Sequence, residues 1–395
     1  MDIIKKLERT IEDCISREEF LQKIKSKKPL KIKYGVDVTA PFLHLGHAVN
    51  LWMMRDMQEQ GHSVQFLIGD FTTLIGDPTG KSQTRPLVQK ETIQKNALDF
   101  IQQVSKVLIT DDSSLFKVYY NSDWFASMPL EKFLELLSLV THSKLIARDM
   151  FQKRIKEESH IYMHEMIYPI LQGYDSKVLD SDLTIIGSDQ LFNELMGRFF
   201  QEKFQQSPQV VMTSSITPGL DGINKQSKSL NNYIAITDSS RDMFGKILSL
   251  PDSLITLWMK VYTTISLQSI EDYSRDLKNG TNPRDLKIIL AKGIIQRYYS
   301  QDIAEQEKEW FLETFSKKSF PQDAPVVEMQ SMSILQCLFS LPLELSKSEI
   351  RRLFDQKSIQ VNNEKVSPET LLTSGNYEIK IGKRMFYKIL IKETL

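Results

Sequence analysis

The segment SVQFLIGD (63–70) constrains the fold of this chain most strongly. Its apolar run is typical of a strand that is buried on both faces, and such strands belong to parallel sheets covered by helices. KIKYGVDV (31–38) precedes it and KVYYN (117–121) follows it as further strands, with helical segments between them. This alternation predicts an α/β fold with a doubly wound parallel sheet of Rossmann-like type.

The segments on either side extend the pattern. The start of the sequence, MDIIKKLERTIEDC, is amphipathic and predicts an N-terminal helix rather than a signal peptide. We expect further helices over 45–60, where Gly61 ends the helix, 88–108 and 190–204, and further strands over 182–187 and 209–213.

Changes in this pattern predict several domains. Residues 1–232 would form the sheet domain, with a mostly helical insertion over 129–180. Helix follows helix over 233–315, and 316–330 is a polar, proline-containing candidate linker. The remainder, 331–395, predicts a small α+β domain with one helix near 348–356 and short strands in SIQVN, NYEIK and MFYKILI.

Charge and cysteine content exclude several classes of protein. The 395 residues include 50 Lys plus Arg and 50 Asp plus Glu, so any nucleic-acid binding must rest on local charge. Residues 343–395 include ten basic and seven acidic residues, a small local excess of three positive charges. Two distant cysteines, Cys14 and Cys337, form no disulfide framework and no metal cluster, which suits a cytoplasmic protein. No segment is long enough to span a membrane, so we expect no membrane partner.

GDPTGKS (76–82) resembles a phosphate-binding P-loop but fails its spacing. Three residues separate Gly76 from Gly80, whereas the P-loop requires four. An aspartate inside the loop would also repel a phosphate. Asp77 follows a buried strand, however, and ligands of open parallel sheets bind at the carboxyl edge of the strands. Asp77 is therefore a candidate ligand-binding residue.

HLGH (44–47) lies where a strand leads into a helix. The free N–H groups and the positive dipole end of a helix N-terminus suit an anion, and Gly46 would let a nucleotide approach the backbone. The imidazoles of His44 and His47 could donate hydrogen bonds to a phosphate in a transition state. Taken alone, the motif fits capping histidines equally well.

KQSKSLNNYI (225–234) supplies the second half of the pattern. Lys225 and Lys228 lie three apart on a short polar loop and could close on a leaving pyrophosphate. In this order, the two motifs resemble the His-x-Gly-His and Lys-Met-Ser-Lys-Ser signatures of class I aminoacyl-tRNA synthetases.

The surrounding residues resemble the bacterial tyrosyl-tRNA synthetases from about residue 31 to residue 233. The matching stretches are YGVDVTAPFLHLGH, LIGDPTGKS, YPILQGYDS, IIGSDQLFN and DGINKQSKSLNNY. LSKSEIRRLFDQKSIQVNNEKV resembles the S-four-type RNA-binding domain that ends many of these enzymes. The sequence departs from the family pattern at Val38, Gln226 and Asn231, where proline, methionine and glycine are usual; none of these changes removes a charged or hydrogen-bonding group.

This resemblance implies roles for individual residues. Tyr34 and Asp175 would bind the phenolic hydroxyl of L-tyrosine, a group that both donates and accepts hydrogen bonds. Rejection of phenylalanine would then follow from unpaired polar groups, an effect for which enzymes of this type are themselves the well-known example. Four residues would hold the ammonium and carboxylate of the substrate: Asp77, Tyr168, Gln172 and Gln190. The ATP site would include Gly35, Asp37, Thr39, Gly46, Gly187, Asp189 and Lys228.

The resemblance also implies the reaction and its partners. The tyrosine carboxylate would attack the α-phosphorus of ATP, giving tyrosyl-adenylate and pyrophosphate, and the tyrosyl group would then pass to the 3′ end of tRNA. His44, His47, Lys225 and Lys228 would be the catalytic residues, acting by position and charge. Mg²⁺ would accompany ATP, with no metal held by the protein alone. The helical domain and the terminal domain would bind tRNA, and LEKFLELLSLV is a candidate interface of a homodimer.

Three other interpretations stay open on the residues alone. A tryptophanyl enzyme is disfavoured by GVDVTAPFLHLGH and LQGYD, and a small nucleotidyltransferase would not need the helical and terminal regions. An RNA-binding or regulatory protein without activity is disfavoured by the presence of both histidines and both lysines.

Overall fold

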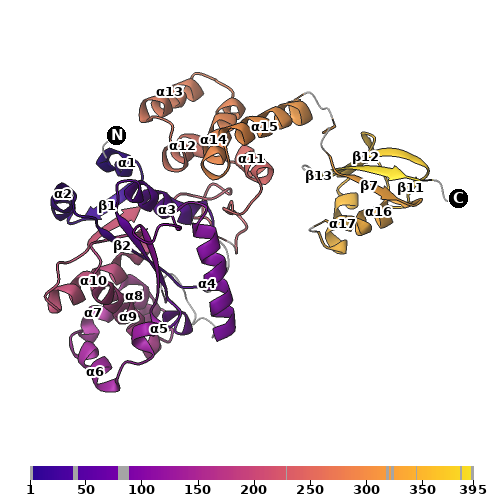
Figure 1. The fold of residues 1–395 in the computed structure, drawn as a ribbon. Coiled ribbons are helices and arrows are strands. Elements are labelled where there is room, and N and C mark those ends of the chain that lie inside the picture. Colours follow the sequence, from indigo (N-terminus) through magenta and orange to yellow (C-terminus); the bar gives the residue numbers. More distant parts are fainter. Residues whose placement is uncertain are drawn as a thin grey trace. The chain divides into compact units, whose positions relative to one another are not determined.

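The computed structural model describes residues 3–38, 43–78, 89–227, 229–316, 320–321, 324–343, 345–382 and 385–392. The chain forms two compact units, Met1–Ser300 and Gln301–Leu395 (Figure 1). Two of the predicted site residues, Thr39 and Lys228, lie outside the described residues.

A six-stranded sheet forms the centre of the first unit, in the order β1-β6-β5-β2-β3-β4. Strands β2 to β6 pair in parallel, as the alternation of strands and helices predicts. The strands are β1 (Ile11–Ile15), β2 (Lys31–Val36), β3 (Ser63–Ile68), β4 (Phe116–Tyr120), β5 (Leu183–Gly187) and β6 (Val210–Ser214). The Gln65 amide is accommodated inside buried β3 because it donates a 2.9 Å hydrogen bond to the Leu179 carbonyl.

The N-terminal prediction is wrong in part. The first helix, α1, covers only Ile3–Glu8, and β1 follows it. β1 pairs antiparallel with β6, so the sheet is mixed rather than wholly parallel. The physical reason is the edge of the sheet: β6 offers unpaired backbone groups there, and an extended segment satisfies them.

Helices cover both faces of the sheet (Figure 1). α3 packs on β3 and β5, and α10 packs on β5 and β6. The helices of this part are α2 (Arg17–Lys25), α3 (Leu45–Gln58), α4 (Lys90–Val104), α5 (Ser122–Phe125), α6 (Leu130–Ser138), α7 (His142–Ile146), α8 (Asp149–Lys156), α9 (Met163–Leu179) and α10 (Leu191–Lys203). Helices α6 to α9 occupy the segment over 129–180, for which the sequence predicts a helical insertion.

Helices α9 and α10 approach each other unusually closely. A Cβ on Gly173 would lie 2.8 Å from the backbone carbon of Met196, and a Cβ on Gly197 would lie 2.5 Å from the Ser176 Oγ. Contacts this short leave no room for any side chain, so glycine at both positions brings the polar side chains of the two helices within hydrogen-bonding distance.

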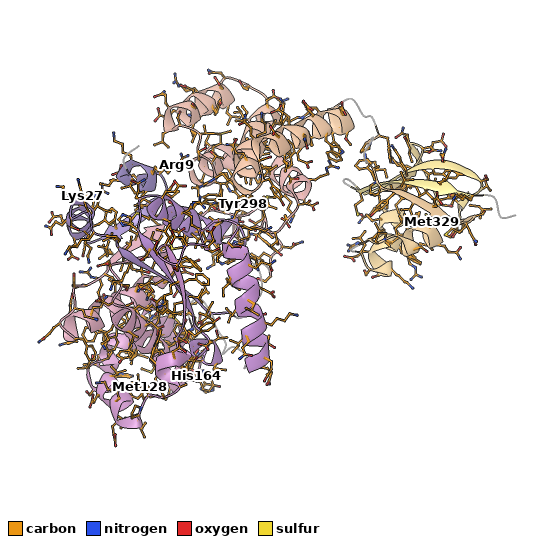
Figure 2. The ribbon with its side chains drawn as sticks, in the orientation of Figure 1. Arg9, Lys27, Met128, His164, Tyr298 and Met329 are labelled. Atoms are coloured by element: carbon orange, nitrogen blue, oxygen red, sulfur yellow. The ribbon has the colours of Figure 1, made fainter. Side chains whose placement is uncertain are left out.

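The helical segment after residue 232 belongs to the first unit up to Ser300. Its helices are α11 (Ser240–Leu248), α12 (Ile255–Tyr262), α13 (Leu267–Lys278) and α14 (Pro283–Tyr298). Side chains labelled in Figure 2 fix this segment to the sheet part. Arg9 donates to the Lys260 carbonyl at 2.8 Å, and the Tyr298 hydroxyl accepts from the Trp52 indole at 3.1 Å.

The second unit contains α15 and a small α+β domain. Its larger sheet has the order β10-β9-β12-β13-β7. The elements are α15 (Gln301–Phe311), η4 (Leu312–Ser316), β7 (Val326–Met329), β8 (Met332–Ser333), α16 (Ile334–Ser340), α17 (Lys347–Asp355), β9 (Ile359–Val361), β10 (Glu364–Lys365), β11 (Leu371–Leu372), β12 (Gly375–Ile381) and β13 (Met385–Ile391).

The predicted linker over 316–330 is too long. β7 (Val326–Met329) lies within it and pairs in parallel with β13, which places this strand in the terminal domain. Its few residues carry no clear apolar alternation, so strand pairing with a distant segment decides its structure.

Within the described ranges, no helix is long and apolar enough to cross a membrane.

Candidate active site

A cavity of about 640 Å³ opens at the carboxyl end of the parallel strands. Such an edge is where open parallel sheets bind ligands, and the volume is suitable for a small molecule together with part of a nucleotide. Every predicted site residue that the structure describes lines it: Tyr34, Gly35, Asp37, His44, Gly46, His47, Asp77, Tyr168, Gln172, Asp175, Gly187, Asp189, Gln190 and Lys225.

His44 and His47 lie at the N-terminus of α3, as predicted. His44 is the residue before the helix, in an extended conformation, and the two imidazole ring centres are 3.8 Å apart. The His44 backbone N–H donates to His47 Nδ1 at 3.4 Å. A Cβ on Gly46 would lie only 3.0 Å from the His44 ring, so glycine is what allows this ring to lie against the helix. The cavity is thus bounded by two imidazoles and the positive end of a helix dipole.

Asp37, which was predicted for the ATP subsite, is hydrogen-bonded to Tyr168, which was predicted for the tyrosine subsite. Its carboxylate accepts a 2.9 Å hydrogen bond from the Tyr168 hydroxyl and another of 2.9 Å from Thr72. Burial raises the pKa of the Tyr168 hydroxyl well above its usual value, and the neighbouring carboxylate of Asp37 raises it further. Tyr168 therefore remains a neutral donor, and it lies where the two predicted subsites meet.

Asp175 lies at a buried part of the cavity wall. Its side chain accepts hydrogen bonds from the Trp124 indole at 2.9 Å and the Asn121 amide at 3.4 Å. Burial raises the pKa of this carboxyl to about 8, although the Lys33 ammonium and the two hydrogen bonds oppose the shift. At neutral pH, Asp175 thus holds a proton in the absence of a ligand, which a carboxyl group can use to donate to an oxygen.

Tyr34 lines the same cavity on β2. Burial raises the pKa of its hydroxyl to about 12, and a hydrogen bond with Asn50 partly offsets the increase. Its ring stacks on Phe66 with ring centres 6.1 Å apart, which fixes the direction of the side chain. Tyr34 presents a neutral phenol to the cavity.

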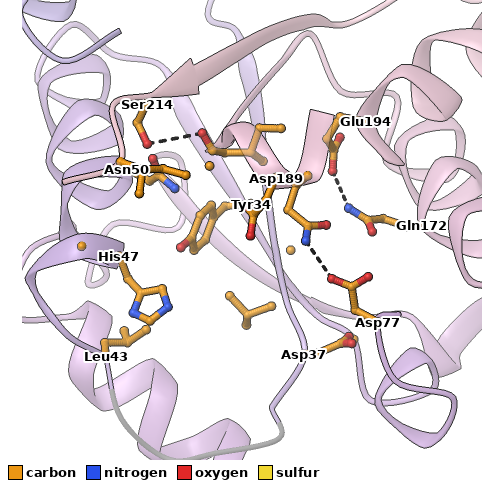
Figure 3. A pocket seen from close by; sticks show the side chains of 18 of the residues that line it. Tyr34, Asp37, Leu43, His47, Asn50, Asp77, Gln172, Asp189, Glu194 and Ser214 are labelled. Atoms are coloured by element: carbon orange, nitrogen blue, oxygen red, sulfur yellow. Dashed lines mark hydrogen bonds between the residues drawn. The ribbon is translucent and has the colours of Figure 1, made fainter. Parts of the chain in front are cut away.

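A cluster of amides and carboxylates forms one side of the cavity, opposite His47 (Figure 3). The Gln190 amide donates to Asp77 at 2.7 Å, and Asn193 donates to the Gln190 oxygen at 2.9 Å. The Gln172 amide donates to Glu194 at 2.9 Å. Each amide oxygen or carboxylate here can accept a hydrogen bond from a cationic ligand group.

Lys225 makes an ion pair with Asp189, with 3.3 Å between the ammonium and the carboxylate. Both side chains are largely exposed, so the pair is weak and Lys225 can leave it readily. A Cβ on Gly187 would lie 2.9 Å from the Asp189 carboxylate. Gln226, the departure from the usual methionine, is buried and donates to the Tyr262 hydroxyl at 2.8 Å.

Four side chains that support this site were not predicted from the sequence. Lys33 and Glu194 form an ion pair of 2.8 Å in which both side chains are almost fully buried, and Trp124 and Asn121 hold Asp175. One signal was present: a lysine in the middle of an otherwise buried strand needs a partner. The identity of that partner depends on the packing of α9 against α10, which the sequence pattern does not show.

Comparison with known proteins identifies close relatives of the whole chain. The family model for class I tRNA synthetases (W and Y) matches residues 25–316. The tyrosine--tRNA ligase of Thermotoga maritima is 41% identical over 395 residues, which is 99% of this chain and 98% of the relative. That of Mannheimia succiniciproducens is 39% identical over 392 residues, again 99% of this chain and 98% of the relative.

Solved structures share the fold at lower identity. A C-terminally truncated mitochondrial tyrosyl-tRNA synthetase from Aspergillus nidulans matches with a TM-score of 0.66 and 20% identity, covering 79% of this chain and 94% of that one. A tryptophanyl-tRNA synthetase from Encephalitozoon cuniculi matches with a TM-score of 0.59 and 16% identity, covering 78% of this chain and 91% of that one.

Proposed function

Because the chain belongs to the class I tRNA synthetases for tryptophan and tyrosine, and joins tyrosine to tRNA with ATP as its bacterial relatives do, we propose that the cavity at the carboxyl end of the sheet is its active site. One observation carries this assignment: fourteen residues from distant parts of the chain, each implied by the family motifs, line the same cavity.

His44 and His47 bind the phosphates of ATP in this proposal. A carboxylate oxygen of tyrosine attacks the α-phosphorus, a new P–O bond forms, and the bond to pyrophosphate breaks. The imidazoles and the N-terminus of α3 stabilise the negative charge that redistributes over the phosphoryl oxygens. Lys225 leaves Asp189 and, with Lys228, closes on the departing pyrophosphate. No covalent bond to the enzyme is needed, because position and charge supply the catalysis.

The substrate tyrosine lies against α9. Asp175 and Tyr34 bind its phenolic hydroxyl, and the depth of Asp175 in the protein makes an unpaired polar group there unfavourable when phenylalanine enters. Asp77, Gln172, Tyr168 and Gln190 hold the ammonium and carboxylate. This arrangement directs the carboxylate toward the histidines across the cavity.

ATP occupies the part of the cavity near α3 and β5. Asp189 binds the ribose, and Gly187 leaves the space beside it open. Gly35, Asp37, Thr39 and Gly46 complete this subsite. Mg²⁺ enters with ATP, bound to phosphate oxygens and water, as is usual for this ion.

The test of the histidine assignment is single-turnover formation of tyrosyl-adenylate. His44→Asn and His47→Asn should each slow the chemical step by about 100-fold, with little change in the dissociation constant of tyrosine. His142→Asn, at an exposed position outside the cavity, is the matched control. Unchanged rates in the two active-site variants would refute the assignment.

Three further proposals concern the rest of the molecule. The helical segment from α11 to α14 and the C-terminal unit bind tRNA, and the ten basic residues over 343–395 support phosphate contacts. The enzyme is a homodimer; Leu130 and Leu134 on α6 are 70% and 54% exposed, which supports an interface there. It acts in the cytoplasm, where bacteria such as those of the relatives keep ATP and tRNA.

A further inference from the structure

A buried ionic cluster forms part of the cavity wall, where Lys33 and Glu194 both line the cavity. The Lys33 ammonium contacts a Glu194 oxygen at 2.8 Å and the Ser176 hydroxyl at 2.7 Å. The Gln209 amide donates to the same Glu194 oxygen at 2.9 Å. Lys33 and Glu194 are 1% and 2% exposed, and Ser176 and Gln209 have no exposed surface. Two charges this deep in the protein carry a large desolvation cost, so stability alone does not account for the ion pair.

The second oxygen of Glu194 is bound differently. It accepts the hydrogen bond from the Gln172 amide nitrogen at 2.9 Å (Figure 3). A carboxylate has only acceptor sites, so the amide of Gln172 must turn its NH₂ group toward Glu194. Its other end, Oε1, is buried and has no hydrogen-bond partner among the residues that the structure describes. Gln172 lines the cavity, and Oε1 is the end of its amide that has no partner among the described residues.

We propose that Glu194 is a positioning residue for substrate recognition: by holding the NH₂ end of the Gln172 amide, it presents Gln172 Oε1 to the α-ammonium of the amino acid. The inference rests on the proposed function, which places Gln172 at that ammonium. It assigns to Glu194 and its counter-ion Lys33 the selection of ligands that carry a positive amino group.

Lys33 has a distinct part in this arrangement. A lone buried carboxyl would take up a proton and could then donate as well as accept, which would permit either orientation of the facing amide. Glu194 is paired with the Lys33 ammonium at 2.8 Å, and a carboxylate in such an ion pair can only accept hydrogen bonds. The amide of Gln172 could adopt two orientations of the same shape, which differ in the exchange of its oxygen and its NH₂ group. The ion pair thus fixes one of them.

The isosteric variant Glu194→Gln should reverse that orientation. The one carbonyl oxygen of the new side chain would remain with the Lys33 ammonium and the Gln209 amide, so its NH₂ group would face Gln172. Gln172 would then turn its own oxygen toward residue 194 and its NH₂ group toward the cavity. Two donors, an amide and an ammonium, would meet in the subsite.

The experiment measures equilibrium binding of three ligands to the full chain by calorimetry. Tyrosine has the ammonium and the carboxylate, tyrosinol has only the ammonium, and 3-(4-hydroxyphenyl)propionate has only the carboxylate. In Glu194→Gln, the dissociation constants of tyrosine and tyrosinol should rise by about tenfold or more, as for one hydrogen bond to a charged group, while that of the propionate should stay the same. Equal weakening of all three ligands, or no change in any, would overturn the proposal.

Two more variants keep the result interpretable. Glu165→Gln is the matched control, because Glu165 is also a buried glutamate of an ion pair, with Arg154, but does not line the cavity; it should leave the ratio of the constants unchanged. The double variant Lys33→Met/Glu194→Leu removes both charges, so it should fold and still lose the preference for the ammonium.

Gln172→Met separates the role of Gln172 from that of Glu194. If this variant binds tyrosine and tyrosinol as the unaltered enzyme does, the proposed role of Gln172 is wrong. If Gln172→Met weakens both ligands while Glu194→Gln weakens neither, only the role of Glu194 is wrong.

Discussion

Asp175→Asn offers a test of the electrostatics of the tyrosine subsite that needs no substrate. The pKa of this carboxyl rises from 3.8 to about 8, chiefly through burial. Between these two values, the folded protein binds a proton that the unfolded chain has lost. The free energy of unfolding therefore falls as the pH rises through that window.

The size of the effect follows from the shift. The reference is a pH well below 3.8, where this carboxyl is protonated in both the folded and the unfolded chain. At about 1.4 kcal/mol per pKa unit, the free energy of unfolding should be lower than at that reference by about 2 kcal/mol at pH 5 and by about 5 kcal/mol at pH 8. Asparagine has no such titration. The substitution has a free-energy cost of its own, because the asparagine NH₂ group would face the N–H donors of Trp124 and Asn121. That cost is the same at every pH. Asp175→Asn should thus gain about 3 kcal/mol relative to the unaltered protein between pH 5 and pH 8.

The measurement is urea unfolding of both proteins at pH 5, 6, 7 and 8, followed by subtraction at each pH. Groups that are common to both proteins cancel in the difference. Asp123→Asn, at an exposed position on α5, is the matched control and gives the baseline for the comparison. A difference for Asp175→Asn that stays constant from pH 5 to pH 8 would show that the carboxyl is ionised throughout, and would refute the reasoning.

Three further predictions follow from the packing. Lys33→Met should lower the free energy of unfolding by about 3–5 kcal/mol because it leaves Glu194 unpaired, and adding Glu194→Leu should restore most of it; an additive loss in denaturant unfolding would contradict this. A chain that ends at Ser300 should form tyrosyl-adenylate normally and charge tRNA at least 100-fold more slowly, because it keeps the first unit whole; equal loss of pyrophosphate exchange and tRNA charging would contradict the division of labour. Gln226→Met should lower the free energy of unfolding by about 0.5–1.5 kcal/mol, since the buried Tyr262 hydroxyl loses one hydrogen bond and keeps the one with Thr217; thermal unfolding of both proteins measures it, and an unchanged stability would show that Gln226 contributes nothing through this contact.

The centre of the sheet was predictable because β3 is buried on both faces. SVQFLIGD carries an apolar run whose meaning does not depend on distant residues. β1 and β7 were not predictable in the same way. Each is an edge strand that forms because a neighbouring strand, β6 or β13, offers unpaired backbone groups. That reason lies in the folded structure rather than in the local sequence.

The candidate site divides along a similar line. Residues within short motifs, such as His44 and His47, were found because a motif fixes both their types and their spacing. Lys33 and Glu194 belong to no motif, and they meet only because β2 passes beside α10 in the folded chain. The pairing of Lys33 with Glu194 in the cavity wall could therefore be seen only in the structure.

The central claim is that this cavity activates tyrosine and no other amino acid. The most direct test is exchange of labelled pyrophosphate into ATP by the full chain, with each of the twenty amino acids in turn and without tRNA. We predict exchange with tyrosine and a rate with phenylalanine that is lower by about 10⁴-fold or more, the range already known for tyrosyl enzymes, because Asp175 and Tyr34 would be left unpaired. Comparable exchange with phenylalanine or tryptophan would contradict the assigned specificity, and no exchange with any amino acid would contradict the assigned active site.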